Sequence, residues 1–108
     1  MKILIESPFY LSDEHKENIE SKLSQLSTFN KKITQVDVFF KLDDGLMPNA
    51  VTAEIHLHIP GPEIFVSEVK EDYWDAFSGA FDKTKRQIRK SKEIKKDSRV
   101  IINGVHTF

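Results

Sequence analysis

Residues 51–59 alternate apolar and polar side chains without interruption, and this run constrains the fold more than any other part of the sequence. Positions two residues apart fall on the same face of a β-strand, so the pattern predicts a strand with one buried face. The apolar set is Val51, Ala53, Ile55, Leu57 and Ile59, and the polar set is Thr52, Glu54, His56 and His58.

Three other segments have strand character. Residues 2–6 place Ile3 and Ile5 on one face, and residues 33–42 alternate in the same way as residues 51–59. A proline-glycine-proline turn then leads into a short predicted strand at residues 63–67. The buried face of residues 33–42 would carry Val36, Val38, Phe40 and Leu42, whereas the aromatic side chains Phe39 and Phe65 would lie on the opposite face of the sheet.

Two helices are predicted from apolar side chains spaced three and four residues apart. The first begins after Ser12, a candidate N-cap, and runs to about Phe29, with Ile19, Leu23 and Leu26 as its stripe. The second covers residues 71–93, and its buried stripe is Phe77, Phe81, Thr84 and Ile88. Gly79 lies inside this second helix, where glycine costs roughly 1 kcal/mol relative to alanine. We attribute it to a close approach of the first helix.

The order of these predicted elements is β-α-β-β-β-α. We therefore expect an α+β fold with one four-stranded mixed sheet and both helices packed on one of its faces. A right-handed crossover would make the first two strands parallel. We expect a single domain over residues 1–96 and a C-terminal tail over residues 97–108.

Positive charge is concentrated near the end of the second helix. Residues 83–96 hold eight of the 16 basic residues and one acid, a net charge of +7. The other 94 residues hold eight basic and 16 acidic residues, a net charge of −8. Such a separation predicts contact with a polyanion at one end of the molecule.

The basic side chains fall on two flanks of the predicted helix, both bordering its apolar stripe. One flank carries Lys83, Arg86 and Lys90, and the other carries Lys85, Arg89, Lys92 and Lys96. A solvated helix end is the alternative, because cations near a helix C-terminus complement its dipole. That effect acts within the last turn and would explain two or three of the eight, so we favour a nucleic-acid contact.

No constellation for catalysis, metal or cofactor binding is evident, so we expect neither enzymatic activity nor a bound metal or cofactor. The chain has no cysteine, and its four glycines form no phosphate-binding loop. His56 and His58 would share a strand face, but a metal site needs a third ligand and the sequence pattern supplies none. The acids at the start of the second helix are explained by capping and the helix dipole. Tyr73 and Trp74 are expected to pack at the rim of the core, with stacking on bases as the alternative.

The last helix carries motifs that resemble the ribosome hibernation promoting factors, a family that includes ribosome-associated inhibitor A and the sigma-54 modulation proteins. The similar segments are Glu71-Asp72-Tyr73-Trp74-Asp75-Ala76-Phe77, Asp82-Lys83, Arg86-Gln87-Ile88, Lys90-x-Lys92, Lys22-Leu23 and Ile33-Thr34-Gln35-Val36. The resemblance covers roughly residues 1–95. The chain departs from the family pattern at Ser78, where aspartate is frequent, and at Gln25, where a basic residue is common.

The resemblance implies a cytoplasmic translation inhibitor that binds the small ribosomal subunit and keeps ribosomes idle in stress or stationary phase. The helices would contact ribosomal RNA in the channel for mRNA and tRNA. The chain looks like a short form of the family, a monomer when free, with a second hibernation factor as a further partner and no membrane contact. The RNA contacts that the resemblance carries over are Lys22, Lys32, Lys83, Arg86, Lys90 and Lys92, and helix geometry adds Lys85 and Arg89.

Two other functions fit the same residues. A general double-stranded RNA-binding module also packs two helices on a sheet, and it would bind duplex RNA as tightly as ribosomal subunits. A protein–protein adaptor or homodimer would use the open face or an edge of the sheet. Its affinity would not depend on salt.

Overall fold

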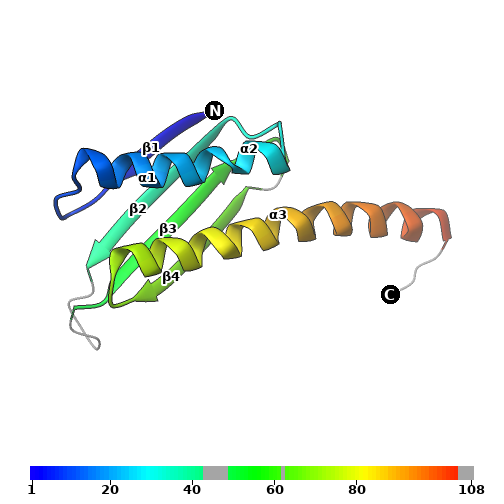
Figure 1. Cartoon of the computed structure of the whole chain (residues 1–108). Helices are drawn as coiled ribbons and strands as arrows, with labels where there is room; N and C mark the ends of the chain where they lie inside the picture. The colour runs from blue at the N-terminus through cyan, green and yellow to red at the C-terminus, as the bar shows by residue number, and fades with distance from the viewer. Residues whose placement is uncertain (43–48, 62, 105–108) are drawn as a thin grey trace.

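A four-stranded sheet with helices on one of its faces forms the protein, as the computed structural model shows (Figure 1). The structure describes the backbone of residues 1–42, 49–61 and 63–104, and side chains in these ranges up to residue 90. The strands β1 (Lys2–Glu6), β2 (Gln35–Leu42), β3 (Val51–His58) and β4 (Ile64–Lys70) lie in the order β1-β2-β3-β4. β1 is parallel to β2, and the other neighbours are antiparallel. The expected fold class is confirmed.

The first helical segment differs from the expected single helix, because it breaks at Gln25 into α1 (Asp13–Ser24) and α2 (Leu26–Phe29). The Gln25 N–H donates to the Lys22 carbonyl, three residues back, which tightens the turn. Hydroxyls of Ser24, Ser27 and Thr28 also donate to nearby backbone carbonyls, a pattern that bends helices. The start was predicted correctly, because the Ser12 hydroxyl accepts the His15 N–H at 3.1 Å.

Helix α3 (Tyr73–Gly104) and strand β4 are both longer than expected. β4 continues to Lys70 because Lys70 still pairs with Val51, the first residue of β3. α3 continues past residue 93 and includes residues 97–104, which we expected to form a tail. Residues 105–108 lie outside the described ranges, and the division at residue 96 stays a prediction.

The core lies between the helices and the sheet. Helix α3 contributes Phe77, Phe81 and Ile88, all at most 2% exposed, as the apolar spacing predicted. Thr84 is fully buried in the same stripe, and its hydroxyl donates to the Ala80 carbonyl at 2.9 Å. Leu42 was expected on the buried face but is 55% exposed, because it ends β2. Within the described ranges, no helix has an apolar stretch long enough to span a bilayer.

Gly79 faces strand β4, so our attribution of this glycine to the first helix was wrong. A Cβ atom at this position would lie 2.8 Å from Cγ of Glu68 and 3.1 Å from its Oε2. Glu68 is held in place because its Oε2 lies 3.4 Å from Nζ of Lys83. The missing side chain therefore leaves room for an ion pair between β4 and α3.

This arrangement predicts that the effect of G79A depends on Glu68. In the parent protein, the new methyl group displaces the Glu68 side chain, and this cost offsets the helix propensity of alanine. In an E68A background the obstruction is gone, so G79A should raise the free energy of unfolding by about 0.5–1 kcal/mol. A double-mutant cycle measured by urea unfolding checks the coupling. Equal effects of G79A in both backgrounds would contradict the contact.

Candidate nucleic-acid interface

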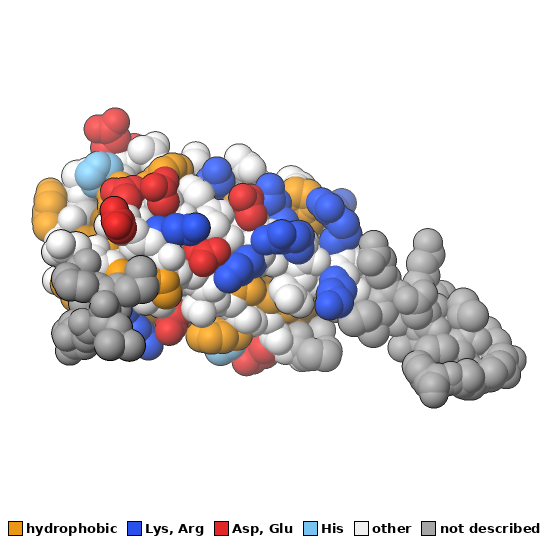
Figure 2. Space-filling model, turned by 90° about the horizontal axis from the view of Figure 1, so that it is seen from below, with side chains coloured by type: hydrophobic (Ala, Val, Ile, Leu, Met, Phe, Trp, Pro, Cys, Tyr) orange, Lys and Arg blue, Asp and Glu red, His pale blue; other side chains and the backbone are white. Residues whose placement is uncertain are grey.

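The basic side chains of α3 separate into two flanks, and each flank borders a different neighbouring element. Figure 2 views the molecule from below relative to Figure 1. On the surface seen there, most of the Lys and Arg side chains gather on one half, whereas acidic side chains are prominent on the other half. The flank with Lys83, Arg86 and Lys90 borders β4. The flank with Lys85 and Arg89 borders α2. The predicted division into two flanks is therefore confirmed for these five residues.

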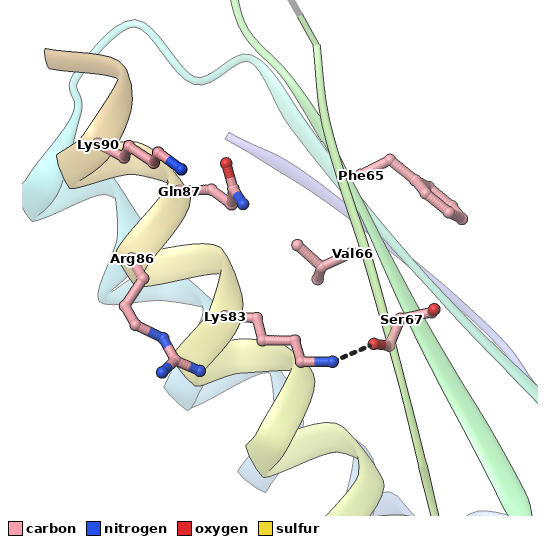
Figure 3. Close-up of a pocket in the computed structure, with 7 residues that line it drawn as sticks. All are labelled: Phe65, Val66, Ser67, Lys83, Arg86, Gln87 and Lys90. Atoms are coloured by element: carbon pink, nitrogen blue, oxygen red, sulfur yellow. Dashed lines mark hydrogen bonds between the residues drawn. The ribbon is translucent and has the colours of Figure 1, made fainter. Parts of the chain in front are cut away.

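The β4 flank forms an open groove of about 500 Å³ (Figure 3). Its lining residues are Phe65, Val66, Ser67, Lys83, Arg86, Gln87 and Lys90. Nζ of Lys83 donates to the Ser67 carbonyl at 2.9 Å and lies 3.4 Å from Oε2 of Glu68. Lys83 thus fastens α3 to β4. Arg86 and Lys90 are exposed and have no ion-pair partner within the described part of the chain.

Glu68 is ionised beside Lys83. Burial alone would raise the pKa of the Glu68 carboxyl, but the Lys83 hydrogen bond and charge, with smaller effects from Val69 N–H and Lys70, lower this pKa below its ordinary value. The carboxylate therefore offsets part of the Lys83 charge at neutral pH. Lys83 contributes to the fold as well as to the basic surface.

The α2 flank borders a smaller pocket of about 230 Å³, which is lined by Thr28, Phe29, Lys85, Ile88 and Arg89. Nζ of Lys85 lies 3.5 Å from Oδ1 of Asp82 and 5.2 Å from the centre of the Phe81 ring. Arg89 is exposed and has no ion-pair partner among the described residues. Among the described side chains of α3, Arg86, Arg89 and Lys90 are therefore the three cations with no acidic partner in the described part of the chain.

Lys22 of α1 joins this surface. Its Nζ lies 5.4 Å from the centre of the Phe81 ring and 5.7 Å from the centre of the Trp74 ring. Lys22 and Lys85 thus approach the same buried aromatic ring from α1 and α3, and such cation–π contacts hold the ammonium groups in position. The sequence analysis missed this role of Trp74 and Phe81, although both lie on the apolar stripe at a spacing of seven.

The structure does not bring all the predicted contacts together. Lys32 is exposed between α2 and β2, where its N–H donates to Oδ1 of Asn30, and no hydrogen bond or ion pair joins it to the described part of α3. The side chains of Lys92 and Lys96 lie outside the described residues. These positions stay predictions.

The acids at the start of α3 have the capping role that we expected. Oδ2 of Asp72 accepts the N–H groups of Trp74 at 3.0 Å and Asp75 at 3.2 Å. Tyr73 and Trp74 pack, half-buried, against the core. We expected this packing and had kept stacking on bases as the alternative.

Comparison with known proteins decides the family. The family model described as Sigma 54 modulation protein / S30EA ribosomal protein matches residues 8–96. The chain belongs to this family. The last-helix motifs that suggested the resemblance lie within the matched region, and the S30EA family match covers α1, the whole sheet except β1, and the described basic flanks of α3.

Curated relatives agree with the S30EA assignment. The chain is 32% identical over 75 residues to a ribosome hibernation promoting factor of Klebsiella oxytoca, covering 69% of this chain and 75% of the relative. It is 29% identical over 83 residues to the ribosome hibernation promoting factor of Escherichia coli K12, covering 77% of this chain and 83% of the relative.

Solved structures show the same fold. A ribosomal subunit interface protein from Coxiella burnetii superposes with a TM-score of 0.75 at 18% identity, covering 86% of this chain and 99% of that one. The N-terminal domain of Protein Y from Thermus thermophilus gives a TM-score of 0.68 at 24% identity, covering 83% of this chain and 98% of that one.

Proposed function

We propose that this protein is a ribosome hibernation factor that binds the small ribosomal subunit and inhibits translation. In this proposal, α3 and α1 face ribosomal RNA in the channel for mRNA and tRNA, so the bound protein excludes both. The observation that carries the proposal is the set of three cations, Arg86, Arg89 and Lys90, that lie on the two flanks of one helix and have no acidic partner among the described side chains. The S30EA family membership supplies the ribosome as the partner.

The chemistry of this surface suits an RNA backbone. Arginine presents planar donor groups that match phosphate, and it carries its charge at any physiological pH. The cations lie along a helix rather than in an enclosed pocket, so the surface fits a row of phosphates better than a single small anion. RNA would be recognised through its shape and backbone, not through its base sequence. We propose that the protein acts in the cytoplasm, as a monomer when free and without catalysis.

The salt dependence of binding tests this proposal. Phosphate contacts release counterions, so the affinity for small subunits should fall as salt rises. Three contacts predict a slope of about −2 to −3 in a plot of log affinity against log salt concentration. Cosedimentation with purified small subunits over a salt series measures it, with binding expected near one copy per subunit. No binding at low salt would refute the proposal.

A comparison with duplex RNA tests the alternative RNA-binding function. A general double-stranded RNA module would bind a duplex of random sequence as tightly as it binds subunits. A hibernation factor should prefer subunits, because their folded RNA positions phosphates against both flanks of α3. Fluorescence anisotropy with a labelled duplex of about 16 base pairs, the length that such a module spans, gives the comparison.

The exposed aromatic on the open sheet face favours a second candidate, the protein–protein adaptor. Phe65 is 58% exposed, and Val69 on the same strand is 40% exposed. An adaptor or homodimer formed through these side chains would persist at high salt. Sedimentation of the free protein at low and high salt separates it from the monomer that we propose.

A further inference from the structure

Two histidines and one aspartate meet on the open face of the sheet, away from the basic helix. Asp37 of β2 lies opposite His56 of β3 in the strand register, and His58 lies two residues further along β3. One ligand atom from each side chain lies within 4.8 Å of the other two. The sequence pattern offered His56 and His58 no third ligand, whereas strand pairing brings the Asp37 carboxylate beside them.

A fourth candidate ligand, a carboxylate oxygen, comes from Glu63, the residue just before β4. Oε2 of Glu63 lies 2.7 Å from Nε2 of His56, and its Oε1 lies 3.6 Å from Nδ1 of His58. Nε2 of His58 lies 2.8 Å from Oδ2 of Asp37. Each imidazole therefore contacts a carboxylate, and the four side chains form one connected group drawn from three strands or their ends.

Asp37 is unusually buried for an acidic residue on the open face of the sheet, because it is only 7% exposed. Nε2 of Gln35 donates to its Oδ1 at 2.7 Å, which fixes the carboxylate and leaves Oδ2 directed at His58. A buried carboxylate whose orientation is fixed by a neighbouring side chain is a common partner of a cation.

We propose that Asp37, His56 and His58, with Glu63 as the fourth ligand, form a Zn²⁺ site on the open face of the sheet. Two imidazole nitrogens and two carboxylate oxygens are a ligand set for tetrahedral Zn²⁺, and the two carboxylates balance its charge. Ca²⁺ and Mg²⁺ take oxygen ligands and fit poorly here. The hydrogen bonds between imidazole and carboxylate are replaced by metal bonds, and any proton that they share leaves for solvent.

Metal binding requires side-chain rotation, because His58 directs Nε2 at Asp37 and Nδ1 at Glu63, and one metal ion takes only one of these nitrogens. Ligand atoms around tetrahedral Zn²⁺ at roughly 2.0–2.1 Å lie about 3.3 Å apart. The hydrogen-bonded pairs at 2.7 and 2.8 Å must therefore open slightly, and ligand atoms that are farther apart must come closer. The backbone of Asp37, His56 and His58 is fixed by the pairing of the two central strands. The centre of the Phe65 ring lies 5.9 Å from that of the His56 ring, with the two rings nearly perpendicular, so Phe65 lies beside the site. Bound metal would link β2, β3 and the start of β4.

Direct titration tests this proposal. Protein freed of metal with a chelator and transferred to chelator-free buffer is titrated with zinc chloride by calorimetry, and Co²⁺ is used as a spectroscopic probe. We expect one Zn²⁺ per chain, a higher melting temperature, and the visible absorption of tetrahedral Co²⁺. Excess Mg²⁺ should not displace the metal. Absence of binding, or binding with the same affinity by an H56N/H58N variant, would overturn the proposal.

Matched variants localise the site. H15N changes the same side chain on α1, outside the cluster, and should leave Zn²⁺ affinity unchanged. Q35A removes the residue that orients Asp37 and should weaken binding by roughly 10–100-fold, whereas H56N/H58N should weaken it more. Circular dichroism of each variant without metal confirms folding. The half-exposed histidines can be replaced without opening the core, so a folded H56N/H58N protein is expected.

Discussion

Charge reversal at Arg86 and Lys90 together, as R86E/K90E, is expected to lower the affinity for small ribosomal subunits by at least about 100-fold. Both side chains border the groove beside β4 and have no acidic partner among the described residues, so the variant breaks no described ion pair. A hydrogen bond to a charged group contributes about 1.5–3 kcal/mol, and two lost contacts account for the factor. Repulsion between the new carboxylates and RNA phosphates adds to the loss. Equilibrium cosedimentation at low salt measures the effect.

The matched control is K2E/K41E, which makes the same change in net charge on the opposite face of the sheet. Lys2 and Lys41 are exposed on β1 and β2, and Lys41 pairs with Glu54 at 3.1 Å. Affinity should fall only a few-fold, because charges that lie farther from the RNA than a screening length are largely screened. Similar losses in both variants would contradict a specific interface. Lys83 is left unchanged, because it also fastens α3 to β4.

Truncation of Phe77 to alanine is expected to lower the free energy of unfolding by about 3–5 kcal/mol. The Phe77 side chain is fully buried, and its ring centre lies 5.4 Å from that of Trp74 and 6.1 Å from that of Phe81. Its removal leaves a cavity under α3, the helix that carries both basic flanks. Urea unfolding followed by circular dichroism gives the change. This loss is a large part of the stability of a domain of this size.

Phe65 provides the control for Phe77. It has the same side chain but is 58% exposed on the open sheet face, so F65A should change stability by less than about 1 kcal/mol. Losses of equal size in the two variants would show that the packing of α3 on the sheet is not the main source of stability.

The sequence predicted the elements whose periodicity is clean. Residues 51–59 alternate strictly, and the structure places Val51, Ala53, Ile55 and Leu57 in the core. The break at Gln25 could not be predicted in this way, because Leu23 and Leu26 continue the apolar stripe across it. The break depends on hydroxyls that bond to the backbone, which a count of apolar positions does not register.

The sequence predicted the cations of the candidate RNA interface, but it did not predict which neighbouring residues those cations contact. From sequence spacing alone, Lys83 and Arg86 are equivalent positions on one flank. The structure distinguishes them, because Lys83 contacts Ser67 and Glu68 whereas Arg86 has no ion-pair partner in the described ranges. These partners come from β4, and only the packing of β4 against α3 brings them together.

The histidine cluster shows a similar limit. On the sequence, Asp37 is one of several polar positions that alternate with Val36 and Val38. Its position opposite His56 depends on the register between β2 and β3, which the connecting segment and the core determine together. A shift of one residue would move Asp37 to the other face of the sheet.

Mapping of ribosomal RNA around α3 tests the central claim most directly. Because the chain has no cysteine, Q87C provides a unique attachment point beside Arg86 for an iron chelate that generates hydroxyl radicals. We predict cleavage of small-subunit RNA that lines the channel for mRNA and tRNA, and loss of this cleavage when R86E/K90E is added. Cleavage confined to RNA outside the channel, or no cleavage by a bound and folded protein, would contradict the account.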